Sequence, residues 1–116
     1  MVDVLFRTSR LRKVCESDKE SRRAHGQDCA KRLMARLADL RAAPSLEELR
    51  HLPGRCHELD GNRKGQLAIE LSGGKRLVFE PADAAAATGA DGGLEWALVE
   101  AVRVLEIVDY HKKKGG

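Results

Sequence analysis

Three side chains that can take part in proton transfer stand side by side near the end of the chain, as Asp109, Tyr110 and His111. Histidine suits general acid–base catalysis because its unperturbed pKa, about 6.5, lies close to neutral pH. Tyrosine titrates near pH ~10 and needs strong local positive charge to act as a base, whereas an aspartate can orient a neighbouring histidine. The alternative is that the three residues only form the polar end of a strand.

The residues that lead up to this group predict a strand, because Val102 to Val108 are mostly β-branched or aliphatic and lack helical spacing. Apolar side chains occupy both of its registers: Val102, Val104 and Val108 in one, Leu105 and Ile107 in the other. A strand that is buried on both faces is usually central in its sheet. Alternation would then place Asp109 and His111 on one face and Tyr110 on the other.

Length and composition indicate one domain that spans residues 1–116. The chain is 42% hydrophobic and 34% charged, which is typical of a globular protein with a modest core. It has no apolar run near the roughly 18 residues that would span a bilayer, and no signal-peptide pattern. Its three cysteines include no Cys-x-x-Cys pair, so we expect reduced thiols in a cytoplasmic protein, with no metal and no cofactor.

Charge is distributed unevenly along the chain, although the net charge is only +3. Residues 1–64 hold 15 Lys or Arg and 10 Asp or Glu, whereas residues 80–100 hold five acidic residues and no basic one. A basic face suits a polyanion such as nucleic acid, or an acidic protein partner. A solvated, arginine-rich helix surface explains the same pattern, so both interpretations stand.

Two helices are predicted in the N-terminal part of the chain. Thr8 or Ser9 can cap the first, whose buried stripe is Leu11, Val14 and Cys15. The strongly polar segment 18–26 is expected to interrupt or end that helix. The second helix spans about 27–42, and one face of it carries Cys29, Leu33, Leu37 and Leu40. A brief helical turn in capping-box form then begins at Ser45.

Beyond Pro53-Gly54 the hydrophobic period changes from near 3.6 to 2. Three strands are predicted around residues 56–60, 66–71 and 76–80, with a basic hairpin loop at 61–65. Together with the final strand they predict an antiparallel sheet of about four strands, and residues 2–6 are a candidate edge strand. Helices followed by strands indicate an α+β fold.

Two segments lie outside this pattern of helices and strands. Residues 80–100 form an acidic excursion between two strands, which we expect to be either a solvated flap or an acidic neighbour of Arg76. Residues 112–116 form a polar tail of lysine and glycine.

Three stretches resemble the RelE/ParE superfamily of bacterial toxins, and most of all its HigB-type host-killer branch. They are residues 57–65 (His-Glu-Leu-Asp-Gly-Asn-Arg-Lys-Gly), residues 75–79 (Lys-Arg-Leu-Val-Phe) and residues 106–111, which end in Asp-Tyr-His. The likeness covers roughly residues 27–80 and 102–111, and Asp-Tyr-His is its most specific part. It implies a RelE-like fold, in which N-terminal helices pack on a small antiparallel sheet.

The resemblance also implies active-site roles for His57, Arg76, Asp109, Tyr110 and His111. Arginine stays protonated and can fork onto two phosphate oxygens, so Arg76 suits charge stabilisation. We expect further RNA contacts from Arg63, Lys64 and Lys75. Other roles stay open for three of these residues: His57 as a core histidine, Arg76 as a partner of Glu58 or Glu70, and Tyr110 as a packing residue.

Two positions depart from the family pattern, with Asp60 where several HigB toxins have lysine and Lys75 where an aromatic residue is usual. The function that the resemblance implies is a type II toxin that cleaves mRNA on the ribosome and is neutralised by a helix-turn-helix antitoxin of HigA type. A ParE-like inhibitor of DNA gyrase is the alternative within the superfamily. A non-catalytic basic binding module is the alternative outside it, although 3% aromatic residues is little for base stacking.

Overall fold

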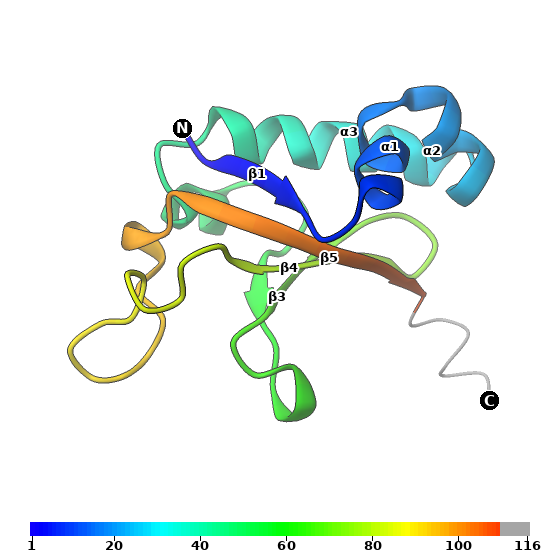
Figure 1. Ribbon diagram of the computed structural model, residues 1–116. Coiled ribbons are helices and arrows are strands. Elements are labelled where there is room, and N and C mark those ends of the chain that lie inside the picture. The colour runs from blue at the N-terminus through cyan, green and yellow to red at the C-terminus, as the bar shows by residue number, and fades with distance from the viewer. Residues whose placement is uncertain (110–116) are drawn as a thin grey trace.

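The computed structural model describes residues 1–109, and residues 110–116 are left aside here (Figure 1). Its first half holds strand β1 (Asp3–Phe6) and helices α1 (Ser9–Glu16), α2 (Asp18–His25) and α3 (Gln27–Ala42). The second half holds strands β2 (His57–Glu58), β3 (Leu67–Glu70), β4 (Lys75–Pro81) and β5 (Ala101–Asp109). Short 3₁₀ turns lie at Leu46–His51, Gly61–Arg63 and Trp96–Leu98. The predicted α+β class is confirmed.

The sheet has five strands in the order β1-β5-β4-β3-β2, and it is mixed. Strand β1 pairs in parallel with β5, whereas the other neighbours are antiparallel. The expectation of a wholly antiparallel sheet of about four strands is therefore wrong. The apolar run at residues 2–6 predicts an edge strand, and β1 is one, but such a run carries no information on a partner almost a hundred residues away. Strand β5 lies inside the sheet, as predicted, although the apolar residues in both of its registers have another cause.

The first helix ends at Glu16, just before the polar segment 18–26, as expected, but that segment is itself helical, because residues 18–25 form α2. Ser17 makes this possible: its N–H donates to the Lys13 carbonyl to close α1, and its Oγ accepts from the Glu20 N–H at 3.2 Å to open α2. Acidic residues in the first turn of α2 and basic ones in the last suit the helix dipole. A polar sequence thus marks a short surface helix, in which only Ser21 is buried.

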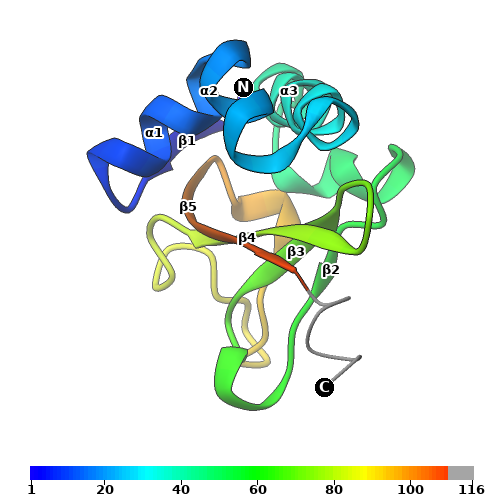
Figure 2. The same cartoon turned by 90° about the vertical axis from the view of Figure 1, so that its right-hand side faces the viewer.

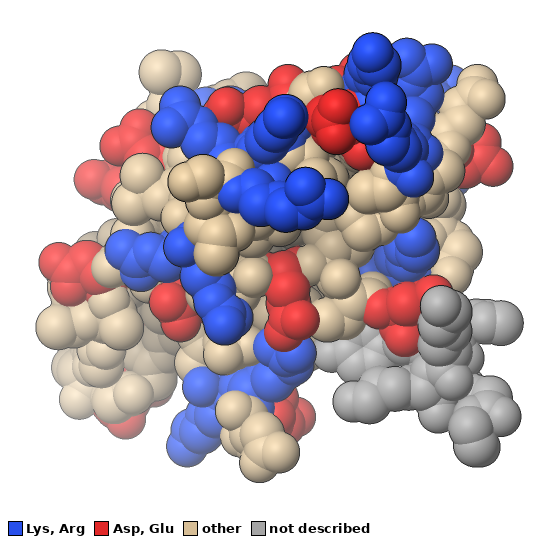
Figure 3. All heavy atoms as spheres, turned by 45° about the vertical axis from the view of Figure 1, so that its right-hand side comes forward, with Lys and Arg blue, Asp and Glu red and all other residues tan. Residues whose placement is uncertain are grey.

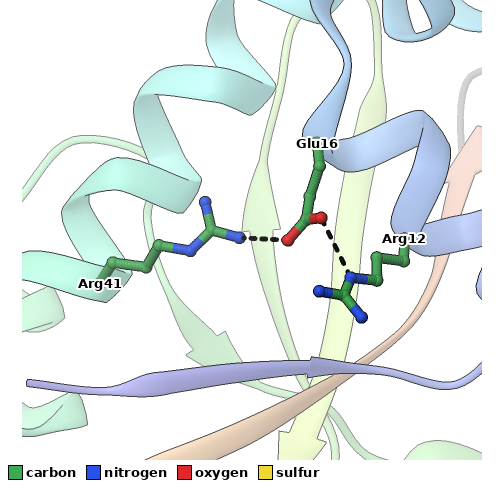
Figure 4. A network of polar contacts seen from close by, with 3 residues as sticks. All are labelled: Arg12, Glu16 and Arg41. Atoms are coloured by element: carbon green, nitrogen blue, oxygen red, sulfur yellow. Dashed lines mark hydrogen bonds and ion pairs between the residues drawn. The ribbon is translucent and has the colours of Figure 1, made fainter.

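Helix α3 has the predicted bounds and buries the predicted stripe, from Cys29 to Leu40. Glu16 ties α1 to it, since its carboxylate lies between Arg12 of α1 at 3.0 Å and Arg41 of α3 at 3.4 Å (Figure 4). The three helices cover one side of the sheet (Figure 2). The core lies between these layers, and Phe79, Leu77 and Ile69 are among its fully buried strand residues.

A bulge in β5 explains why its apolar side chains occupy both registers. Val78 pairs with Glu106 and Phe79 with Val104, so Leu105 is the extra residue. The bulge reverses the alternation, and Ile107 returns to the same core as Val104. Apolar residues in both registers therefore belong to one core-facing side of β5, and the alternation changes register at the bulge.

The acidic excursion is anchored at its base. Trp96 is buried, its indole N–H donates to a Glu58 carboxylate oxygen at 2.8 Å, and the Arg50 guanidinium lies 3.9 Å from its ring centroid. Ala87 is also buried in the core. The segment is therefore part of the packed domain at these two points. Within residues 1–109, no helix is both long enough and apolar enough to cross a bilayer.

Candidate functional site

His57 and Arg76 open onto one pocket of about 370 Å³, which is also lined by Arg55, Cys56 and Glu70. Arg76 of β4 pairs with Glu70 of β3. Arg76 precedes the core residue Leu77, and Glu70 follows the core residue Ile69. Since successive side chains point to opposite faces of a strand, Arg76 and Glu70 lie on the sheet face away from the helices. The pocket therefore lies on the face that the helices leave open.

A tight turn at Gly54 and Arg55 builds one wall of this pocket. Both residues have positive φ, 108° and 49°, and the Gly54 carbonyl accepts from the Glu70 N–H at 2.6 Å. A Cβ on Gly54 would stand 2.7 Å from the Ile69 side chain, so glycine lets the backbone approach β3 this closely. The turn brings Arg55 next to Glu70, and no periodicity in the sequence indicates this contact.

His57 is held in one tautomer by the same turn. Its Nδ1 lies 2.7 Å from the Arg55 carbonyl oxygen, which can only accept a hydrogen bond. Nδ1 therefore carries the proton, and in the neutral ring Nε2 keeps its lone pair. The side chain is partly exposed at the pocket rather than enclosed in the core. This arrangement suits a general base that acts through Nε2.

Glu70 lies between two arginines of the pocket. Its carboxylate is 3.7 Å from the Arg55 guanidinium and 3.9 Å from that of Arg76. Of the two partners foreseen for Arg76, Glu70 is the one in contact, whereas Glu58 binds Trp96. Both distances are longer than a hydrogen bond. A phosphate that enters here would therefore replace the Glu70 carboxylate as the anion beside the arginines, and no bidentate pair would have to break.

Cys56 lies in the same pocket but does not offer a nucleophile. Burial raises the pKa of its thiol to about 12, an effect that Arg50 opposes and Glu58 reinforces. The thiol therefore stays protonated at neutral pH, and the thiolate is the reactive form.

Asp109 lies on the other face of the sheet, because the bulge at Leu105 shifts the end of β5. Asp109 pairs with Lys75, which precedes Arg76 in β4 and whose side chain lies on the helix side. Asp109 also comes two residues after Ile107, which packs against the core on that side. The structure thus brings His57 and Arg76 together and separates them from Asp109 and Lys75. Tyr110 and His111 lie outside the described residues.

The two predicted RNA-binding residues of the 61–65 loop differ in their surroundings. Arg63 contacts Glu106 of β5 and donates to the Gln66 side chain at 2.8 Å, so it fastens the loop to the sheet. Lys64 is exposed. Of the two, Lys64 is the one placed to meet a ligand, and Arg63 has a structural task.

The surface charge is mixed rather than uniformly basic. Lysine and arginine gather over the helical layer and again below it, with acidic residues between them (Figure 3). Several helix arginines have acidic neighbours, among them Arg22 with Asp18 and Arg36 with Asp39. Among residues 1–109, no three His, Cys, Asp or Glu side chains gather as they would to hold a metal ion.

Comparison with protein-family models and with curated protein sequences yields no match to this chain. Sequence patterns alone do not indicate two residues of interest, Arg55 and His25, since each acquires its neighbours only through folding, whereas Glu70 was foreseen as one possible partner of Arg76.

Proposed function

We propose that this protein is an mRNA endoribonuclease that acts on the ribosome, as the toxin of a type II toxin–antitoxin pair. The observation that carries the proposal is the shared pocket of His57 and Arg76, which is lined both by a base with a defined lone pair and by a permanent cation. The resemblance of residues 57–65, 75–79 and 106–111 to HigB-type toxins supports the same conclusion. RNA supplies the matching chemistry, a 2′-hydroxyl next to a phosphodiester.

In the proposed reaction, Nε2 of His57 takes the proton of the 2′-hydroxyl. The 2′-oxygen then forms a bond to phosphorus, and the bond from phosphorus to the 5′-oxygen breaks. Arg76, with Arg55 beside it, stabilises the charge that develops on the non-bridging oxygens. The 5′-oxygen leaves with a proton, for which His111 is the proposed donor. The products are a 2′,3′-cyclic phosphate and a 5′-hydroxyl.

The test is single-turnover cleavage of mRNA on programmed ribosomes, with free mRNA and gyrase supercoiling assayed in parallel. We expect cleavage on ribosomes, little on free RNA, and unchanged supercoiling. Inhibition of supercoiling would favour the ParE-like alternative. Ribosome binding without cleavage would favour a non-catalytic module, for which the separation of Asp109 from His57 is the supporting observation.

The proposed antitoxin surface is a groove of about 440 Å³ between α1, the end of α2 and β5. Leu11, Val14, Leu105 and Ile107 give it apolar walls, and Arg7 and Arg10 give it positive charge. Strand β1 pairs with β5 only as far as Val104, so the stretch that follows borders this groove. We expect antitoxin affinity to fall as salt rises and on Arg10→Glu. Binding that is unchanged by both would contradict this surface.

A further inference from the structure

His25 of α2 contacts Lys75 of β4 on the helix side of the sheet, and the strand partner of Lys75 is Asp109 of β5. His25 is the last residue of α2, and its Nδ1 lies 3.3 Å from the Lys75 Nζ. Lys75 is the first residue of β4 and stands opposite Asp109, the last described residue of β5. Asp109 is followed in the sequence by Tyr110 and His111. This contact therefore connects the end of a helix to the strand end that leads into the proposed acid.

The contact depends on the protonation state of His25. A lysine ammonium group can only donate, so Nδ1 must accept, and it can accept only when the imidazole is neutral. Protonation would replace the acceptor with a second cation beside Lys75. The surroundings favour the neutral ring, because burial, and then the charge of Lys75, lower the pKa of His25 below its usual 6.5.

The other charged or titratable groups near His25 come from four elements. Arg7, Arg10 and Glu106 line the groove that His25 borders, and Glu106 is itself in contact with Arg63. Cys29 of α3 is buried beneath, and both Lys75 and Asp109 act on the pKa of its thiol, which burial raises. The nearest partner of the His25 ring is a cation, and positive groups outnumber acidic ones around it.

We infer that His25 is a positioning residue: its neutral ring holds Lys75 beside the described end of β5 and so steadies that strand end up to Asp109. This inference rests on the proposed endoribonuclease for its effect on rate. Its structural part, a proton-sensitive contact between α2 and the end of the sheet, stands without that function. When His25 takes up a proton, the contact is lost and the strand end loosens, so acid lowers cleavage by a route separate from His57.

Three variants test the kinetic part by single-turnover cleavage on programmed ribosomes between pH 5 and 8. His25→Gln keeps a neutral acceptor for Lys75, so we expect a rate within about threefold of the original at pH 7.5 and a weaker loss of rate in acid. His25→Ala removes the acceptor and should lower the rate about 10- to 100-fold at pH 7.5, the range expected when a catalytic group is misplaced by roughly 1 Å. His51→Gln changes an exposed histidine of the 46–51 turn and is the matched control.

Amide hydrogen exchange of residues 105–109 tests the structural part and does not depend on activity. We expect exchange there to accelerate between pH 7.5 and 5.5, after correction for intrinsic rates, and to be fast at both pH values in His25→Ala. Protection that is unchanged in His25→Ala overturns the inference, as does a His25→Gln pH profile identical to the original. If the original protein does not cleave RNA at all, the proposed function fails. The exchange data alone then test whether the contact of His25 with Lys75 holds the end of β5.

Discussion

At the residue scale, the pocket combines a histidine with a defined tautomer, two arginines and one carboxylate. Arg76 is the residue on which the proposed chemistry depends most, because it is permanently charged and lies on the same sheet face as the pocket. Glu70 has the opposite effect, since it occupies the position next to both guanidinium groups that a phosphate would take.

Arg76→Ala should lower ribosome-dependent cleavage by about 10²–10³, the usual cost of losing one preorganised contact to transition-state charge. Arg103→Ala is the matched control, because Arg103 is similarly exposed and also has an acidic neighbour, Glu80 at 3.5 Å, outside the pocket. The measurement is single-turnover cleavage, with thermal melting to show that both variants fold. Equal rates for the two variants would remove Arg76 from the site.

Glu70→Gln should tighten RNA binding, because it removes an anion that competes with phosphate for Arg55 and Arg76. The ion pairs are partly exposed, so the gain should be modest, up to about fivefold. Affinity for a short RNA with a 2′-O-methyl group at each position can be measured by fluorescence anisotropy, with Glu80→Gln as the control. Weaker binding by Glu70→Gln would show that Glu70 orients the arginines rather than competes.

At the element scale, the turn at Gly54 and the bulge at Leu105 decide which side chains meet. The turn places Arg55 and His57 against β3, and the bulge sends Asp109 to the helix face. Neither feature is part of a regular helix or strand pattern. Each is a local change in the backbone that redirects the side chains that follow it.

Gly54→Ala should destabilise the fold more than Gly61→Ala. Both positions have positive φ, which costs a residue with a Cβ about 1–2 kcal/mol. A Cβ at Gly61 meets nothing within 4 Å, whereas one at Gly54 would press on buried Ile69 and add roughly 1–3 kcal/mol. Urea unfolding measures the difference, and equal midpoints for the two variants would show that the turn relaxes without cost.

At the scale of the whole molecule, a helical layer covers one face of a mixed sheet (Figures 1 and 2). The candidate site lies on the other face. The first strand joins the last in parallel, so the two ends of the described chain are held in one sheet. Through its contact with Lys75, His25 connects the helical layer to the end of the sheet at which β4 begins and β5 ends.

Folding stability should fall in acid partly because of His25. Its pKa is lowered in the folded state, so the unfolded chain binds this proton more readily, and stability must rise with pH over the titration range. The contribution is complete above pH 6.5 and is lost as pH falls below it, through the folded-state pKa. His25→Gln should show a shallower decline in the free energy of unfolding between pH 7 and 5. Parallel declines would show that His25 has the same pKa in both states.

Several features could be predicted from the sequence because they depend on neighbours along the chain. The bounds of α3, the α+β class and the strands around residues 66–71 and 76–80 follow from hydrophobic period and turn residues. The candidate site was predictable only in part: residue types and the HigB-type resemblance indicate His57 and Arg76, which share a pocket.

Tertiary structure alone decided the remaining features. Three of them join residues far apart in the chain: the parallel pairing of β1 with β5, the position of Glu70 between Arg55 and Arg76, and the contact of His25 with Lys75. The fourth, the side on which Asp109 lies, depends on one bulge. Periodicity reports which residues are buried, because burial repeats with the backbone geometry. It does not report which buried faces meet, since that choice is made by packing of the whole core.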